Sequence, residues 1–380
     1  MKLIYIANTT LPTKRAHGLQ IMKMCAAFTE AGLETKLVVP RRFPPKELKG
    51  KDPFEYYRVE KKFRIKKIFC LDLIVLDKLL GSVAFFIQSF SFSFFLVLHL
   101  LFQKNALLYS RDRIGLFFAS LFFKNTVFEI HKINRRFFWG PVKRAKKIVV
   151  ISRGLKEELV KGGVPENKIL VAGDGVEARD FVVAENAQAC RQKLNLPPEE
   201  KLVVYTGHLY DWKGVETLAL ASRFLPEGVK VVLVGGLPGD LARFEKLIRK
   251  ENLSKILLLG HKDHGQIPFF LKAADCLVLT GTRKSRVSEK FTSPMKMFEY
   301  LAAQKPIVAS DLPSFREVLN EQNAVLVEPD DPRALAEGVK NVLTDQKLSE
   351  KISAQAMEDV QRYSWSDRAK IIREFISERE

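Results

Sequence analysis

Short apolar runs rich in β-branched residues alternate with helical patterns along nearly the whole chain. Such runs, bounded by glycine, proline or polar residues, predict buried strands, and the segments between them predict helices. Near the start, a predicted strand at 3–7 is followed by a helix at 19–31, which Gly32 ends, and by a strand at 36–39, which Pro40 ends. This order is a βαβ unit, whose two strands run parallel.

The same alternation continues in two series. The first adds strands at 107–110, 126–130 and 147–151 and helices at 114–123 and 152–161. The second consists of strands at 202–206, 230–234, 256–259, 276–279, 306–309 and 324–327, with helices between them. The polar stretch 183–200 separates the two series.

We therefore predict an α/β protein of two Rossmann-like domains, 1–182 and 183–362, each with a doubly wound parallel sheet. A length of 380 residues agrees with two or three compact units. In such sheets ligands bind beyond the carboxyl ends of the strands, so we expect the site in a cleft that the two domains face.

One segment does not fit the alternation. Residues 79–102 carry no formal charge over 24 positions, about 36 Å as a helix, which is long enough to cross a bilayer. Ser82, Gln88, Ser89 and His99 within it, and its place between strands of one predicted sheet, argue against crossing. A buried helix, or a helix or helix pair that dips into the membrane surface, fits the sequence better.

Charge distinguishes the two halves. The chain has 62 Lys and Arg against 44 Asp and Glu, a net charge of +18, and residues 1–190 hold 33 of these basic and 17 of these acidic residues. Within 41–67, eleven basic residues face four acidic ones. This basic half attracts an anion, which could be nucleic acid, acidic lipid headgroups or phosphorylated substrates. Next to the apolar segment it favours peripheral contact with an anionic membrane leaflet.

The remaining composition limits the cellular compartment of the protein and the kinds of binding site that the chain can form. With 47% hydrophobic residues the chain can bury a large core. Its first apolar run is too short for a signal peptide, and the four cysteines form no CxxC pair, so we expect free thiols and a cytoplasmic location. Neither GxGxxG nor the Walker sequence occurs, nor does Asp-x-Asp or a metal-spaced cluster. We predict no metal ion and no other cofactor.

Four residues in loops or on a helix face are candidates for chemistry. Gly18 ends the loop 8–18 between the first strand and its helix, where backbone amides can bind an anion. Lys213 precedes a helix start, which the helix dipole disfavours unless a phosphate lies there. Glu299 shares a helix face with apolar residues and needs a hydroxyl or cationic partner. His131 follows a strand at its carboxyl end.

Several motifs, in this order and spacing, resemble one known family. They are SRD at 110–112, EIH at 129–131, VVISRGL at 149–155, DGVEARDF at 174–181, GHLYDWKG at 207–214 and SPMKMFEYLAAQKPIVAS at 293–310. Together they resemble the family 4 glycosyltransferases, which have the GT-B fold. The resemblance covers nearly the whole chain, and the segment 363–380 resembles the last GT-B helix, which returns to the first domain.

The resemblance implies a retaining glycosyltransferase that uses a nucleotide sugar without a bound metal. It implies that Lys213, with Gly207, holds the donor diphosphate and that Glu299 holds the ribose. Gly18 would bind the phosphates through its amide. His131 would contact the transferred sugar.

Two positions depart from the family pattern. An arginine is usual four or five residues before the lysine, and here His208 lies five before it, so Arg153, Lys290 or Lys296 would have to add charge. A glutamate is usual eight residues before the ribose glutamate, and here that residue is Phe291. Donor-sugar contacts would then come from Glu289 or from the backbone around three adjacent residues. These are Ser293, Pro294 and Met295.

We expect a glycosyltransferase that moves a sugar from a UDP- or GDP-linked donor to a lipid-linked or polysaccharide acceptor, peripheral on the inner face of the cell membrane. Three alternatives stay open. They are a nucleotide-sugar epimerase of related architecture, a non-catalytic nucleotide-binding protein of the same fold, and a nucleic-acid-binding protein that uses the basic half.

Overall fold

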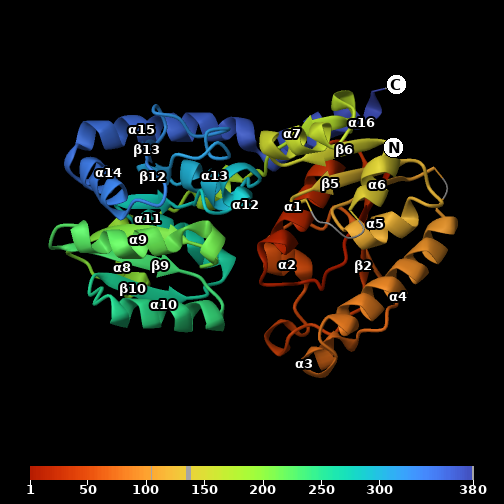
Figure 1. Ribbon diagram of the computed structural model, residues 1–380, viewed down its shortest axis with the longest axis horizontal. Coiled ribbons are helices and arrows are strands. Elements are labelled where there is room, and N and C mark those ends of the chain that lie inside the picture. The colour runs from red at the N-terminus through yellow and green to blue at the C-terminus, as the bar shows by residue number, and fades with distance from the viewer. Residues whose placement is uncertain (104, 134–137, 379–380) are drawn as a thin grey trace. The chain divides into compact units, whose positions relative to one another are not determined.

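The computed structural model describes residues 1–103, 105–133 and 138–378 and divides into two compact units. Unit 1 comprises 1–151, 155–173 and the segment from 365 onward. Unit 2 comprises 152–154 and 174–364. The chain therefore leaves the first unit and returns to it at its end, where the last helix, α16 (Trp365–Ser377), packs against α1 (Ala16–Glu30), and Figure 1 shows the C-terminal end in unit 1. Helix α7 (Arg153–Lys161) begins at the crossing between the units.

Within the described residues, unit 1 is built on a seven-stranded sheet whose paired strands are all parallel. From one edge to the other the strands are β3 (Arg64–Ile68), β2 (Glu34–Pro40), β1 (Lys2–Ile6), β4 (Leu107–Ser110), β5 (Thr126–Ile130), β6 (Lys147–Val150) and β7 (Ile169–Val171). Its remaining helices are α1 (Ala16–Glu30), α2 (Pro53–Tyr57), α3 (Asp77–Leu80), α4 (Ser82–Leu101), α5 (Arg113–Ala119) and α6 (Trp139–Arg144).

Alternate residues of each strand face opposite layers of helices. Ile4 and Val38 pack against α4 through Phe92 and Leu96. On the other face, Tyr109 packs against Phe28 of α1, with ring centroids 5.1 Å apart. Both layers are needed because a parallel sheet must bury both of its faces.

The described part of unit 2 has a six-stranded parallel sheet. Its order is β10 (Ile256–Gly260), β9 (Val229–Val234), β8 (Lys201–Thr206), β11 (Cys276–Leu279), β12 (Ile307–Ser310) and β13 (Val325–Val327). The helices are α8 (Ala187–Lys193), α9 (Val215–Ala221), α10 (Pro238–Lys250), α11 (Ile267–Ala273), α12 (Arg286–Lys290), α13 (Met295–Ala302), α14 (Pro332–Thr344) and α15 (Gln346–Asp359).

Two domain boundaries in the structure differ from those that the sequence predicts. The break between the units lies at 173/174, where the sequence predicts 182/183, because Phe181 packs into the core of unit 2 and Val176 pairs with Ser364 there. The returning segment of unit 1 likewise begins at 365. Residues 379 and 380 of the predicted terminal helix lie outside the described residues.

Two strands were absent from the sequence prediction. β3 reads RIKKI, in which three of five residues are charged, and it is an edge strand with one partner, β2. The charged residues conceal it from an apolar pattern. β7 has only three residues, at the other edge of the same sheet. Both edges are short or charged, which protects them from pairing with another chain.

The uncharged segment 79–102 forms the end of α3 and the helix α4, with a break at Gly81, whose φ is 52°. Helix α4 is long and apolar enough to cross a membrane, although part of it is buried in unit 1. It forms one layer of the unit 1 sandwich and lies at its periphery in Figure 1.

In unit 2 the loops after β8 and β9 meet through two glycines. Gly207 and Gly235 have φ values of 119° and 125°, and a Cβ on Gly235 would lie 2.2 Å from the Gly207 carbonyl oxygen. The Gly207 amide in turn donates to the Val234 carbonyl at 2.8 Å. Because neither glycine has a side chain, the two loops pack backbone against backbone. This contact fixes the position of the loop that begins at Gly207.

Replacing Gly235 with alanine is expected to destabilise unit 2, because strain and overpacking each cost about 1–3 kcal/mol. We expect its melting temperature to fall by roughly 5 °C or more. Gly228→Ala is the matched control, since Gly228 also has a positive φ, 75°, but no atom within 4 Å of the added Cβ. Its loss should be about 1 kcal/mol. Equal losses in the two thermal melts would show that contact with Gly207 does not require glycine.

Candidate functional site

The loop after β8 brings two lysines of unit 2 together. A Cβ on Gly207 would lie 2.9 Å from the Lys296 Nζ atom, so the glycine leaves room for that ammonium group. Lys296 belongs to the first turn of α13 and is buried, with Nζ 3.5 Å from the centroid of the Tyr205 ring. Lys213 lies at the other end of the same loop, directly before Gly214 and α9.

The charges of these lysines are not neutralised within unit 2. In the described parts of the chain, neither Nζ atom has a carboxylate oxygen within 4.0 Å. Burial lowers the pKa of Lys213 to about 8, although the Glu299 charge opposes this shift. Burial, and then repulsion from Lys213, lowers the pKa of Lys296 well below its ordinary value. Two close cations of this kind favour a bound anion.

His208 cannot supply a third positive charge at neutral pH. Its ring stacks on Tyr210, with centroids 4.8 Å apart and an interplanar angle of 13°. Burial, and then the charge of Lys213, lowers the pKa of His208 to about 4. The imidazole is therefore neutral near pH 7 and offers only hydrogen bonding.

Of the three cations proposed to compensate for His208, Lys296 is the one beside Gly207. Arg153 is exposed, and its amide donates to the Glu317 carboxylate at 2.7 Å. Lys290 is also exposed, and its carbonyl accepts a hydrogen bond from Ser152 at 2.9 Å.

Glu299 lies one turn after Lys296 on α13 and is buried. The nearest polar side chain described for it is that of His264, whose Nε2 atom lies 3.2 Å from Oε1. Its carboxylate also raises the pKa of Lys213 and that of Lys296, although burial dominates both shifts. Glu299 is therefore part of the same charged group as the two lysines.

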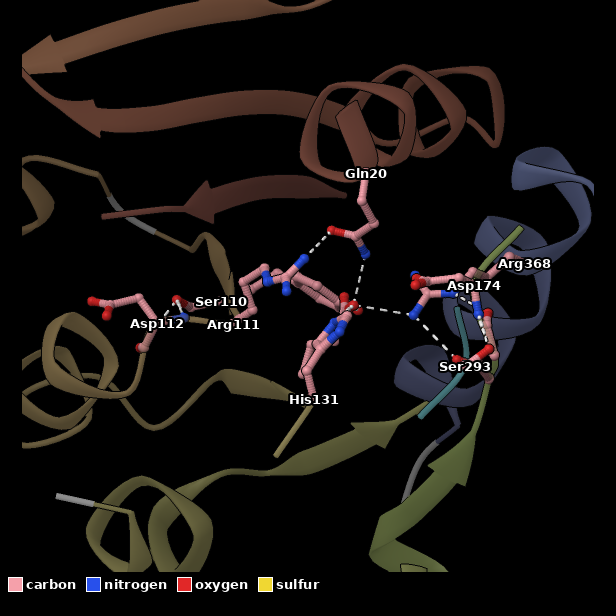
Figure 2. Close-up of polar contacts among 12 residues, drawn as sticks. Gln20, Ser110, Arg111, Asp112, His131, Asp174, Ser293 and Arg368 are labelled. Carbon is pink, nitrogen blue, oxygen red and sulfur yellow. Dashed lines mark hydrogen bonds and ion pairs between the residues drawn. The ribbon is translucent and has the colours of Figure 1, made fainter. Parts of the chain in front are cut away.

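The segment before α13 is held by backbone contacts. The Ser293 hydroxyl accepts a hydrogen bond from the Asp174 amide at 3.0 Å, a contact that Figure 2 shows, and Pro294 precedes Met295 at the helix start. Glu289 is half-buried on α12, and its carbonyl accepts from the Ser314 amide. Phe291, at the position of the family's glutamate, is buried.

In unit 1, a buried carboxylate lies next to His131. Glu129 is the fourth residue of β5, is fully buried and accepts four hydrogen bonds. The donors are Gln20 Nε2 at 2.8 Å, Arg368 Nη2 at 3.1 Å, the Tyr109 hydroxyl and His131 Nε2 at 2.6 Å. Figure 2 shows Gln20, His131 and Arg368 pointing toward one another.

Charge neutralisation keeps this carboxylate ionised. Burial alone would raise the pKa of Glu129, but the charge of Arg368 and the hydrogen bond and charge of His131 outweigh burial. Arg111, which donates to Gln20 at 2.7 Å, acts in the same direction. The pKa of Glu129 is therefore held well below its usual range, and the ionised group holds a proton on His131 Nε2.

The first turn of α1 supplies a second histidine, His17. Burial, and then the charges of Arg111 and Arg15, lowers the pKa of His17 to about 3, and its Nε2 atom lies 2.9 Å from the Thr9 hydroxyl. Gly18 follows within α1, where a Cβ would lie 2.1 Å from the Tyr57 hydroxyl. Its amide donates to the Arg15 carbonyl at 3.0 Å.

Sequence reasoning placed His131 at the end of a strand but assigned no role to Glu129 or Arg368. Each carried a signal. Glu129 is the only charged residue in the apolar strand TVFEI. Arg368 lies on the buried stripe of α16 with Trp365 and Ile372, where an apolar residue is expected.

In the described residues, no group of three or more His, Cys, Asp or Glu side chains could hold a metal ion. The four cysteines are free and buried.

Comparison with known proteins matches unit 2 to a family. Residues 186–359 match the model of glycosyl transferases group 1. An uncharacterised glycosyltransferase of Methanocaldococcus jannaschii is 29% identical over 234 residues, which cover 59% of this chain and 58% of that protein. WcaI of Escherichia coli, a putative colanic acid biosynthesis glycosyl transferase, is 24% identical over 61% of this chain and 56% of its own length. The chain thus spans a little over half the length of these relatives.

The fold has a close counterpart among solved structures. Anabaena HepE, in a complex with UDP and glucose, superposes with a TM-score of 0.78 over 100% of both chains, at 16% identity. Each unit therefore has the architecture of one GT-B domain, and the predicted fold class is confirmed.

Replacing Arg368 with methionine is expected to destabilise unit 1 by about 3–5 kcal/mol, because it leaves a buried carboxylate without its cation. The pKa of Glu129 is depressed in the folded chain, so its stabilisation is present above the unfolded pKa and is lost as pH falls. The difference in melting temperature between wild type and variant should therefore be largest at neutral pH and shrink below about pH 4.5.

Arg373→Met is the control for this change, on the same helix. Arg373 is exposed and donates one hydrogen bond, to the Ala31 carbonyl at 2.6 Å, so its loss should cost about 1 kcal/mol. A difference for Arg368→Met that does not depend on pH would contradict an ionised Glu129.

Proposed function

We propose that this chain is a glycosyltransferase that transfers a sugar from a UDP- or GDP-linked donor to a lipid-linked or polysaccharide acceptor. In this proposal configuration is retained and no metal ion takes part. The observation that carries it is the pair of close lysines, Lys213 and Lys296, whose charges are not neutralised beside the bare backbone of Gly207.

The difficult step in such a transfer is the departure of a nucleoside diphosphate, on which negative charge develops as the glycosidic bond breaks. Fixed cations at that position stabilise the transition state more than the ground state. Lys213 and Lys296 supply two such charges, and Lys296 takes the place of the arginine that the family has where this chain has His208. In this way the lysines do the work that a divalent cation does elsewhere.

The ribose and the sugar of the donor are assigned to residues on and next to α13. The Glu299 carboxylate accepts hydrogen bonds from the ribose hydroxyls, with its orientation set by His264. The backbone from Ser293 to Met295, fixed through the Asp174 amide, holds the donor sugar together with Glu289. A buried Phe291 removes one acceptor from that pocket, so backbone groups carry more of the sugar recognition.

In this proposal His131 of unit 1 contacts the transferred sugar. Because Nε2 donates its proton to the Glu129 carboxylate, the ring is held in one orientation. His131 contacts the substrate in this proposal, and Glu129 acts through it.

Relatives support the substrate classes. HepE was solved with UDP and glucose, which supports a UDP-linked donor. The name of WcaI refers to colanic acid biosynthesis, which supports a polysaccharide acceptor. An inner-leaflet location follows from a lipid-linked acceptor and the basic, apolar first unit.

Thermal shifts in magnesium-free buffer test the donor site. We expect UDP or GDP, with its sugar conjugates, to raise the melting temperature of wild type by several degrees. Lys213→Ala, Lys296→Ala and Glu299→Gln should each weaken binding at least about tenfold, since charged hydrogen bonds contribute about 1.5–3 kcal/mol. Lys290→Ala removes an exposed lysine nearby and should leave binding unchanged.

Absence of a shift with any nucleotide, or equal shifts in the lysine variants and wild type, would overturn the donor site. Product analysis then separates the enzyme classes. Release of UDP or GDP that requires an acceptor supports transfer, a converted nucleotide sugar supports an epimerase, and binding without either product supports a non-catalytic protein.

Binding should also take up protons. The pKa of Lys213 is about 8 in the free protein, and a bound diphosphate raises it by favouring the charged form. At pH 9 only about a tenth of free Lys213 is charged, so affinity should fall roughly tenfold between pH 7 and 9. Calorimetry of UDP binding at pH 8 in two buffers of different ionisation enthalpy should detect this uptake.

Lys213→Arg keeps the positive charge at all these pH values and should flatten the Lys213 part of the pH dependence. An affinity that stays constant from pH 7 to 9 in wild type would contradict the depressed pKa.

A further inference from the structure

Helix α4 turns large apolar side chains outward and also buries polar ones. Five of its exposed apolar residues recur at intervals of seven, four, four and three positions, which places these five on one face, whereas exposed Phe85 lies on another. This outward stripe consists of Val83, Phe90, Phe94, Leu98 and Leu101. The polar residues Gln88, Ser89 and Ser93 lie instead on the buried face.

The buried polar residues are bonded within unit 1. Gln88 Nε2 donates to the Asn8 side-chain oxygen at 3.0 Å, and Asn8 Nδ2 donates to the Ser89 hydroxyl at 3.0 Å. Ser93 donates to the carbonyl of Ser89 at 2.7 Å. The buried face of α4 therefore contacts the rest of unit 1 through these polar residues as well as through Phe92, Leu96 and Leu100.

The outward stripe is large and continues beyond α4. Phe94 is 61% exposed, and Phe102 at the helix end is 84% exposed. Helix α5 packs beside α4, with the rings of Phe90 and Phe118 5.5 Å apart, and the loop after it exposes Leu121 and Phe122. Contiguous apolar surface of this kind marks an interaction site.

A basic strip borders the stripe on the same face of the sheet. Register pairs Ile4 with Lys36 and Lys36 with Arg64, so these side chains share the face that Ile4 turns to α4. Lys36 Nζ lies 3.3 Å from the His99 ring of α4, and exposed Lys66 lies two residues beyond Arg64 on edge strand β3.

The cations of this strip repel one another. Burial and the charges of Lys2, Lys66 and Arg64 lower the pKa of Lys36. In the described part of the chain, no carboxylate lies within 4.0 Å of any of these four cations. Such a strip attracts an anionic surface.

We propose that the outward stripe of α4 and the basic strip of Lys2, Lys36, Arg64 and Lys66 form one docking surface for an anionic lipid bilayer. The helix lies in the plane of the membrane, with its phenylalanines among the acyl chains and the strip against the headgroups. This inference rests on unit 1 and is independent of the nucleotide site in unit 2.

Two other occupants fit the surface less well. A second copy of the chain in a two-fold dimer would bring two basic strips to one interface, where like charges repel. A membrane crossing would pull Phe92, Leu96 and Leu100 out of the core that they form with the sheet, and would expose the bonded polar stripe to lipid.

The docking helix also reaches the loop at the carboxyl end of β1. Asn8, which Gln88 and Ser89 hold, opens the loop that leads to His17 and α1. A lipid surface on α4 therefore places membrane-anchored acceptors next to this loop, which favours the lipid-linked class over a free polysaccharide.

Vesicle sedimentation tests the surface. Full-length protein is mixed with vesicles of phosphatidylcholine, with or without 30% phosphatidylglycerol. We expect binding to the anionic vesicles that weakens at least tenfold on addition of 0.5 M NaCl. Phe94→Gln with Leu98→Gln, and separately Arg64→Gln with Lys66→Gln, should each reduce binding about tenfold or more.

Matched controls remove the same groups elsewhere in unit 1. Lys143→Gln with Lys161→Gln takes two exposed charges, and Ile371→Gln takes an exposed apolar residue of α16. These should bind vesicles within about twofold of wild type. All variants should keep the nucleotide-induced thermal shift, so that failure of the docking surface and failure of the donor site can be told apart.

A fluorophore on Phe94→Cys gives a second readout, because the native thiols are buried. Its emission should shift to the blue with anionic vesicles, and the same dye on Ile371→Cys should not shift. Three results would overturn the proposal. The first is no binding to anionic vesicles, and the second is binding that only detergent reverses, which indicates that the helix crosses the membrane. The third is a wild-type dimer in lipid-free solution that Phe94→Gln converts to a monomer.

Discussion

All strands within each sheet run in one direction, and this constraint organises the rest of the molecule. Parallel neighbours cannot be joined by tight turns, so every connection crosses a face of the sheet, and both faces are covered. Every loop that follows a strand then lies at the same end of the sheet, the end where the strands have their carboxyl termini. Gly207 and Gly235 touch there because β8 and β9 are neighbours, and His131 lies at the same end of the sheet in unit 1. The candidate chemistry is concentrated at these ends because the strand direction requires it.

Two clusters of buried charged residues respond to the loss of hydration in opposite ways. Glu129 loses its hydration but gains Arg368 and three further hydrogen bonds, so it stays ionised and forms part of the framework. Lys213 and Lys296 lose hydration, and no carboxylate of the described residues lies within 4.0 Å of either ammonium group, so burial lowers their pKa values despite the charge of Glu299. A neutralised cluster can do without a ligand, whereas an unneutralised one is stabilised by binding one. This difference is why the diphosphate is assigned to unit 2 and a positioning role to Glu129.

The first unit is completed by the end of the chain. Arg368 of α16 reaches Glu129 across 239 residues of sequence, and Arg373 of the same helix reaches the end of α1. The carboxylate that orients His131 therefore depends on a helix that folds back after unit 2 has been made. Helix α4 likewise has two different faces, since its inner face holds Asn8 while its outer face exposes large apolar side chains.

The sequence by itself determined the local features. Hydrophobic periodicity predicted most strands, the long apolar helix and the strand before His131, because these patterns span only a few residues. The motifs GHLYDWKG and SPMKMFEYL located Lys213 and Glu299. Periodicity did not identify β3 or β7, whose edge positions weaken the pattern. Tertiary structure alone decided that Lys296 rather than Arg153 or Lys290 lies beside Gly207, that Arg368 neutralises Glu129, and that α4 turns its phenylalanines outward. Each of these depends on which strands are neighbours and which helix covers which face, and local sequence patterns do not specify such long-range packing.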